Sequence, residues 1–79
     1  MQIELIKQQI AQQMDCAFIE ITGDGQHFQA LVVSDAFIGK TRVQQQQMVY
    51  ACLQSWITSG ALHALSLKTL TVADWQANG

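Results

Sequence analysis

The sequence has little positive charge. Of its 79 residues only four are basic, against six that are acidic, and the formal net charge is −2. Neutralising many phosphates requires several cations gathered on one surface. The basic residues Lys7, Lys40, Arg42 and Lys68 are too few for such a surface. We therefore predict that nucleic acid is an unlikely or weak partner.

Cysteine is scarce as well. The chain has only Cys16 and Cys52, and the long interval between them leaves no C-x-x-C motif. A disulfide framework or a cysteine-based zinc site therefore has little support. We expect both residues to be reduced thiols in small apolar positions.

Long apolar runs are absent too. No stretch of 18 apolar residues could span a bilayer, and Glu4 and Lys7 interrupt the segment where a secretory signal would be continuously apolar. We therefore expect a cytoplasmic chain without membrane association. Apolar residues nevertheless make up 49% of the chain and charged residues only 13%. That balance is typical of a folded chain, and the length indicates one domain spanning residues 1–79.

The first third of the sequence predicts a helix followed by a β-hairpin. Apolar residues recur at every third or fourth position across Ile3–Met14, which indicates one face of an amphipathic helix. β-Branched and aromatic residues are enriched in Cys16–Thr22 and again in His27–Ser34. The Asp-Gly pair within Gly23–Gln26 is typical of a turn that joins two antiparallel strands.

A helical connection is predicted next. Residues Asp35–Lys40 read as a helical turn broken at Gly39, and Thr41 then begins a long helix that ends near Gly60. The expected apolar stripe of this helix consists of Val43, Val49, Tyr50, Leu53, Trp56 and Ile57.

The last part of the chain predicts a strand and a short helix. The strand is Leu62–Leu70, and Thr71 caps the helix, with Asp74 in its first turn and Trp75 packed back on the domain. The predicted fold class is therefore α+β, with a small sheet packed against helices.

Topology brings the two histidines together. The connection between the second and third predicted strands is long enough for a helical crossover, so these strands can run parallel. His27 begins one of them and His63 begins the other. Since parallel strands start at the same end of a sheet, we expect both imidazoles beside the 23–26 turn. Two imidazoles placed in this way resemble a half-built metal site.

Other interpretations compete with a metal site. A single histidine at a strand start is more often a half-buried packing residue bonded to a backbone carbonyl. A zinc site from both histidines and both cysteines has little support, because Cys16 and Cys52 are expected away from the histidine end. The sequence does not indicate an enzyme, since it contains no recognisable Ser-His-acid or Cys-His arrangement. Asp24, near His27, is an ordinary solvated turn carboxylate in this reading.

Three blocks of the sequence resemble the BolA family, most closely its small IbaG (YrbA) branch. They are "GDGQHF" in the hairpin, "VVSDAFIGKTRVQQQQMVY" through the turn and the long helix, and "LHALSLKTLTVADW" at the end. Their order and spacing match the family over nearly the whole chain. The resemblance implies an αββααβα BolA-like fold related to the type II KH domain, with a three-stranded mixed sheet packed against helices.

The resemblance also implies a partner and a cofactor. BolA-family proteins associate with monothiol glutaredoxins, and the pair can hold a bridging [2Fe–2S] cluster in iron–sulfur trafficking or in the response to iron or acid stress. In the family, a histidine matching His63 is a cluster ligand, and a second ligand matches His27. Glutaredoxin and glutathione sulfur would complete the cluster. On this basis we expect no enzymatic activity and no cluster tightly bound to the isolated chain, which would be a monomer or weak homodimer.

The chain departs from the family in the long helix, and this departure bears on an alternative function. Many members have basic residues and a histidine where this sequence has Gln44–Gln47. A KH-like DNA-binding regulator would rely on Lys40 and Arg42, yet no second glycine follows Gly39 to form a G-x-x-G clamp. We therefore expect the glutamines to form a solvated helix face, with Gln46 or Gln47 half-covered, and any DNA binding to be weak.

Overall fold

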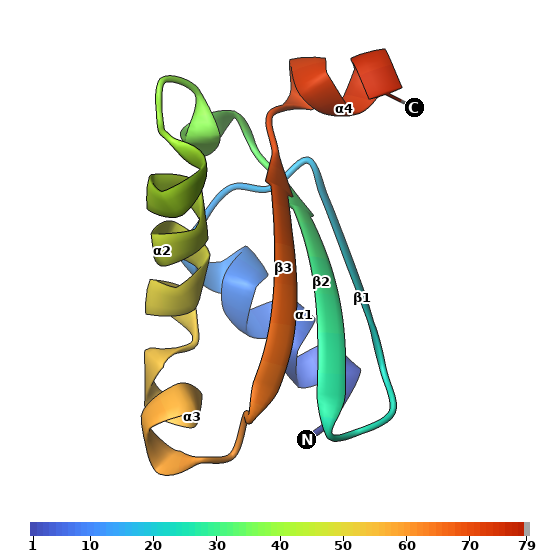
Figure 1. Cartoon of the computed structure of the whole chain (residues 1–79), viewed down its shortest axis with the longest axis vertical. Coiled ribbons are helices and arrows are strands. Elements are labelled where there is room, and N and C mark those ends of the chain that lie inside the picture. The colour runs from blue at the N-terminus through green and yellow to red at the C-terminus, as the bar shows by residue number, and fades with distance from the viewer. Residues whose placement is uncertain (79) are drawn as a thin grey trace.

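Three strands form one mixed sheet, and helices cover one of its faces (Figure 1). The computed structural model describes residues 1–78. In chain order the elements are α1 (Ile3–Gln13), β1 (Phe18–Gly23), β2 (His27–Val33), the 3₁₀ turn η1 (Asp35–Phe37), α2 (Arg42–Cys52), α3 (Gln54–Ser59), β3 (Ala64–Leu70) and α4 (Val72–Asn78). The α+β class and the αββααβα order are confirmed. No helix among residues 1–78 is both long and apolar enough to cross a membrane.

The strand pairing follows the predicted topology. The order in the sheet is β1, β2, β3; β1 pairs with β2 in the antiparallel sense, and β2 pairs with β3 in the parallel sense. The crossover between β2 and β3 contains η1, α2 and α3. Both parallel strands therefore start at the same end of the sheet, at the bottom of Figure 1.

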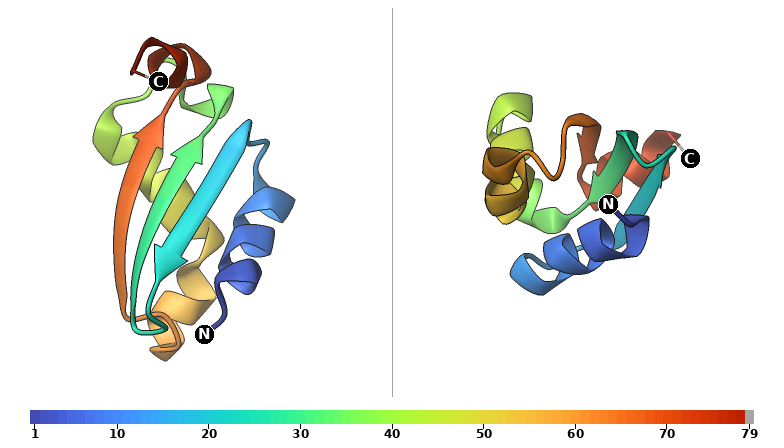
Figure 2. Two further views of the ribbon diagram at one scale, coloured as in Figure 1. Left: turned by 90° about the vertical axis from the view of Figure 1, so that its right-hand side faces the viewer. Right: turned by 90° about the horizontal axis from the view of Figure 1, so that it is seen from below.

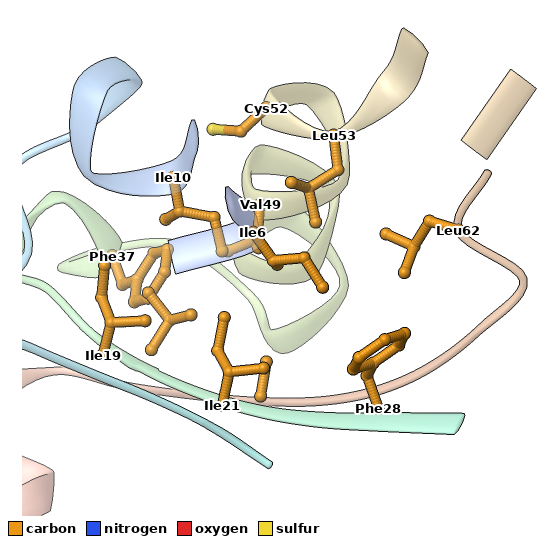
Figure 3. Packing of buried hydrophobic residues seen from close by; sticks show 12 residues of the cluster. Ile6, Ile10, Ile19, Ile21, Phe28, Phe37, Val49, Cys52, Leu53 and Leu62 are labelled. Atoms are coloured by element: carbon orange, nitrogen blue, oxygen red, sulfur yellow. The ribbon is translucent and has the colours of Figure 1, made fainter. Parts of the chain in front are cut away.

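The core lies between the sheet and the covering helices (Figure 3). Alternation along each strand turns one set of side chains inward, and the helices contribute residues about one turn apart. Ile6 and Ile10 of α1 are fully buried, as their spacing predicts. The cluster consists of Ile6, Ile10, Ile19, Ile21, Phe28, Ala30, Val32, Phe37, Val49, Cys52, Leu53 and Leu62.

The prediction of a single long helix over residues 41–60 is wrong, because the helical segment is divided at Leu53 into α2 and α3. Leu53 has φ −111° and ψ 9°, outside the α-helical values, and its side chain is fully buried. The carbonyl of Cys52 instead accepts hydrogen bonds from the side-chain amides of Gln9 and Gln13, at 3.3 and 3.1 Å. These bonds from α1 replace the helical hydrogen bond lost at the break. Leu53 can therefore enter the core without leaving the Cys52 carbonyl unpaired.

Part of the predicted apolar stripe is also wrong. Val43 is 63% exposed and Ile57 is 37% exposed. Val43 lies in the first turn of α2, and Ile57 follows the break, so the two do not share one buried helix face with Val49 and Leu53. The latter two are fully buried, as the periodicity predicts.

The strand ends differ slightly from the prediction. β1 begins at Phe18 rather than at Cys16, and β2 ends at Val33 because Ser34 already belongs to the following turn. The Ser34 hydroxyl accepts a hydrogen bond from the Ala36 amide at 3.1 Å and donates one to the Asp15 carbonyl. Serine is a common N-cap residue, and this cap starts the 3₁₀ turn η1.

Helix α4 lies across the end of the sheet opposite the starts of β2 and β3 (Figure 2). The Thr71 hydroxyl caps it by accepting a hydrogen bond from the Asp74 amide at 3.2 Å. The Trp75 ring stacks on Phe18, with ring centroids 4.9 Å apart and planes at 16°. The predicted packing of Trp75 is thus confirmed, and the remaining outer face of the sheet stays free of α1, α2 and α3 (Figure 2).

Candidate functional site

A hydrogen-bonded turn places His27 at the start of β2. The Asp24 carboxylate oxygen Oδ1 accepts hydrogen bonds from the backbone amides of Gln26 and His27, at 2.9 and 2.8 Å. The Asp24 amide in turn donates to the His27 carbonyl at 3.2 Å. Gly25 has φ +98°, a left-handed conformation that an L side chain rarely adopts. The "GDGQH" stretch is therefore an Asx turn that fixes the His27 backbone and leaves its ring exposed.

Glycine at position 23 permits this turn to close. A Cβ atom there would lie 2.5 Å from the His27 carbonyl oxygen and 2.7 Å from Cδ1 of Phe28. Phe28 is 2% exposed and belongs to the core. The residue after His27 thus anchors the strand start inside the molecule, and the absence of a side chain at Gly23 lets β1 approach it.

A second anchored segment places His63. Gly60 ends α3 with φ +82°, and the Leu62 amide donates a hydrogen bond to the Trp56 carbonyl at 3.1 Å. Leu62 is 3% exposed and points into the core (Figure 3). His63 follows directly and is exposed, one residue before β3 begins. Each histidine therefore adjoins a buried apolar residue that fixes its backbone.

The two histidines lie at the same end of the sheet, as the topology predicts. His27 pairs with Ala64 in the parallel register, so His63 is one residue away from the position beside it. A shallow surface hollow of about 460 Å³ connects the two segments; it is lined by Met1, Gly25, Gln26, His27, Ala61, His63 and Ala64. Side chains separated by 36 positions in sequence thus line one hollow, and neither imidazole is a buried packing residue.

The Asp24 carboxylate supplies negative charge beside one of the rings. Its oxygen Oδ2 lies 3.8 Å from Nδ1 of His27, and both side chains are largely exposed. The hydrogen bonds from the His27 and Gln26 amides, together with the nearby imidazole, lower the pKa of Asp24 below its ordinary value. The carboxylate is therefore ionised at neutral pH.

The cysteines do not join the histidine end. Cys16 precedes β1, whose first residue pairs with the last residue of β2, at the far end of the sheet. Burial raises the pKa of Cys16, with smaller contributions from Cys52 and Asp15, and burial also raises the pKa of Cys52. Both are free thiols, and within residues 1–78 no group of three or more His, Cys, Asp or Glu side chains could hold a metal ion.

The cations predicted for nucleic-acid contact lie elsewhere. Lys40, in the connection from η1 to α2, and Arg42, the first residue of α2, are exposed at a tip that Figure 1 shows opposite the starts of β2 and β3. The tip also exposes Ile38 at 64%. Two cations form no extended basic surface, so the structure offers no support beyond their exposure for the DNA-binding alternative.

Three of the glutamines have structural roles that sequence reasoning missed. Gln44 completes a capping box with Thr41 at the start of α2. The Gln45 amide nitrogen donates to the carbonyls of Phe37 and Lys40, at 3.2 and 3.1 Å. The Gln46 side chain donates to the carbonyl of Leu67 on the edge strand β3, at 3.3 Å. Gln46 is half-buried as predicted and Gln45 is half-buried as well, whereas Gln44 and Gln47 are exposed, as the interpretation of the run as a solvated face predicts.

Comparison with known proteins agrees with this architecture. Residues 3–74 match the family model described as a BolA-like protein. The chain is 42% identical over 57 residues to the acid stress protein IbaG of Escherichia coli K12, covering 72% of this chain and 68% of that protein. An uncharacterized protein of Haemophilus influenzae is 37% identical over 76 residues, or 96% of this chain and 89% of that protein.

Solved structures lead to the same conclusion. The structure of a BolA protein homologue from Coxiella burnetii has a TM-score of 0.84 at 35% identity and covers 96% of this chain and 97% of that one. Sequence and fold therefore agree over nearly the full length. The chain belongs to the BolA family.

Proposed function

We propose that this chain is a non-enzymatic partner of a monothiol glutaredoxin and that His63 and His27 ligate a bridging [2Fe–2S] cluster between the two proteins. The observation that carries the proposal is the pair of exposed imidazoles at one end of the sheet, each anchored by a buried neighbour. The proposal applies to this chain an association that the BolA family implies.

The donor set suits a shared site. Imidazole nitrogen replaces thiolate at some iron–sulfur centres, so two histidines are chemically acceptable ligands for one iron. A [2Fe–2S] cluster takes four ligands. The histidine end of the sheet offers two imidazoles, and the two thiols of the chain lie elsewhere. The glutaredoxin cysteine and glutathione sulfur would therefore supply the other two ligands.

The contribution of the chain itself is to fix the backbone at both histidine ligands. The Asx turn and the buried Phe28 fix the backbone of His27, and Leu62 fixes that of His63. A bound cluster would supply one-electron redox chemistry, and histidine ligation would raise its reduction potential and make assembly sensitive to protonation of the rings.

The cellular role that we propose is iron–sulfur trafficking or the response to iron or acid stress. Support for acid stress comes from the name of one relative, the acid stress protein IbaG. A role that depends on cluster binding fits the protonation chemistry of imidazole, because a protonated ring cannot bind iron.

The proposal is tested by reconstitution. The purified chain is mixed with a monothiol glutaredoxin, glutathione, ferrous iron and sulfide, and visible circular dichroism is recorded. We expect a heterodimer spectrum that differs from that of the glutaredoxin homodimer. His63→Ala should abolish or alter this spectrum, and His27→Ala should weaken it.

Matched controls lie at the other end of the sheet. Lys40→Ala and Arg42→Ala remove exposed side chains of similar size from the tip, and they should leave the spectrum unchanged. A heterodimer spectrum that survives both histidine substitutions would refute the ligand assignment. Absence of any complex would refute the proposed function and give priority to the DNA-binding regulator.

A further inference from the structure

The turn that presents His27 also brings a carboxylate to one particular nitrogen of its ring. Asp24 Oδ1 is held by the backbone amides of Gln26 and His27, at 2.9 and 2.8 Å, so the carboxylate cannot rotate freely. The second oxygen, Oδ2, faces Nδ1 of His27 at 3.8 Å. Within residues 1–78 this oxygen has no other side-chain partner at ion-pair distance. The turn thus aims a fixed negative charge at Nδ1 rather than at Nε2.

A small rotation completes the hydrogen bond. The side chains of His27 and Asp24 are 76% and 71% exposed, so neither is confined by packing, and 3.8 Å is about 1 Å beyond the usual length of a hydrogen bond to a charged oxygen. A neutral imidazole carries its proton on one of its two nitrogens. An adjacent carboxylate stabilises the tautomer in which Nδ1 carries it.

We propose that Asp24 is a positioning residue for His27: its carboxylate accepts a hydrogen bond from Nδ1–H and leaves the Nε2 lone pair facing outward to a metal ion. Histidines that bind metals commonly donate their other N–H to a carboxylate, which fixes the ring and increases the basicity of the ligating nitrogen. The inference rests on the proposed function for the identity of the metal. The tautomer preference itself belongs to the metal-free chain.

The second histidine provides an internal contrast. No carboxylate lies within ion-pair distance of His63 in the described part of the chain. On one side its ring lies near Gly60, where an added Cβ would be 3.9 Å from Cε1. The two imidazoles are therefore inequivalent, and only His27 should prefer the Nδ1–H tautomer.

A purely structural role for Asp24 is the alternative. The Asx turn needs one oxygen acceptor at this position, and asparagine supplies it as well as aspartate does. Asp24→Asn therefore keeps the two bonds to Oδ1 and replaces Oδ2 by an amide nitrogen, which cannot accept from Nδ1–H. The variant separates the turn from the positioning role without disturbing the core.

The experiment is a long-range ¹H–¹⁵N correlation spectrum of the imidazole rings in the metal-free chain, recorded at about pH 8, above the ordinary range of imidazole titration. We expect the ratio of Nδ1–H to Nε2–H in His27 to fall by roughly threefold to tenfold in Asp24→Asn. The His63 ratio should not change. Asp74→Asn, the same change on α4 at the other end of the sheet, should leave both rings unchanged.

The outcomes distinguish this inference from the proposed function. Backbone amide shifts of Gln26 and His27 report whether the turn persists in Asp24→Asn. An unchanged His27 tautomer ratio with an intact turn would overturn the inference, whatever the chain binds. A shifted ratio supports it even if reconstitution with glutaredoxin yields no cluster, and only the proposed function would then fail.

Discussion

The two ends of the sheet are both exposed, but they use their polar groups differently. At the end where β2 and β3 start, the backbone is fixed by Asp24, Phe28 and Leu62, while the rings of His27 and His63 make no hydrogen bond within residues 1–78. Each ring therefore has a nitrogen available to a ligand.

At the opposite end the polar side chains are already occupied. Gln45 donates to the carbonyls of Phe37 and Lys40 and accepts a hydrogen bond from the Thr69 hydroxyl at 2.8 Å. The side chains that remain exposed there include Ile38, Lys40 and Asp74, and none of them is an imidazole. Exposure alone therefore does not identify the site: the histidine end is the better candidate because its imidazoles extend from a fixed backbone and make no hydrogen bond within residues 1–78.

The largest expected effect tests the anchoring of the histidine end. Leu62→Ala removes a buried side chain next to His63, and it should lower the free energy of unfolding by about 2 to 4 kcal/mol. Ile38→Ala at the other end removes a side chain that is 64% exposed, and it should change stability by less than about 0.5 kcal/mol. Urea unfolding monitored by far-UV circular dichroism measures both. Equal losses of stability in the two variants would contradict the claim that the histidine end is anchored by buried residues and the tip is not.

The next largest effect is expected from a glycine substitution at the histidine end, compared with one at the tip. Gly23→Ala places a Cβ 2.5 Å from the His27 carbonyl oxygen, and the resulting clash should lower stability by about 1 to 3 kcal/mol. Gly39→Ala has open space but φ +79°, so only backbone strain of about 1 kcal/mol is expected. Amide chemical shifts should move around His27 in the first variant and around Lys40 in the second. Shifts confined to the mutated residue in Gly23→Ala would argue against the close approach.

A smaller effect concerns the hydrogen bonds of the tip. Gln45→Ala leaves the carbonyls of Phe37 and Lys40 without their side-chain donor and should destabilise the fold by about 1 to 2 kcal/mol. Gln47→Ala alters an exposed side chain and should be neutral within about 0.5 kcal/mol. Hydrogen exchange should accelerate at Lys40 and stay unchanged at His27 in the Gln45 variant. Acceleration at both ends would mean that the ends are coupled.

The smallest effect is the acid response of the Asx turn. The pKa of Asp24 is lowered in the folded chain, so its contribution to stability is complete above the ordinary value of 3.8 and is lost as pH falls through the lowered folded value. Amide exchange at Gln26 should therefore report a turn that loosens only in that acid range. Asp24→Asn should remove this dependence, whereas Asp74→Asn should retain it.

Much of this arrangement could be predicted because it depends on local patterns. The spacing of Ile6 and Ile10 predicts α1, the Asp-Gly pair predicts the hairpin, and the long connection predicts parallel strands. From those three features alone, His27 and His63 come to the same end of the sheet.

What could not be predicted depends on contacts between distant segments. The break at Leu53 coincides with hydrogen bonds from Gln9 and Gln13, which lie 43 and 39 positions before the Cys52 carbonyl that they reach. The approach of Asp24 to His27 had a local signal, their spacing of three residues, but only the turn geometry shows which oxygen faces the ring. Helical periodicity contains neither kind of information.

The most direct test of the central claim is to count the imidazole nitrogens of this chain that bind iron. The chain is labelled with ¹⁵N only at histidine, combined with unlabelled glutaredoxin and glutathione, loaded with cluster and reduced, and studied by pulsed electron paramagnetic resonance. We predict ¹⁵N couplings from two rings, one lost in His27→Ala and the other in His63→Ala. A fully formed cluster without any ¹⁵N coupling would contradict the account, because its ligands would then all come from the partner and glutathione.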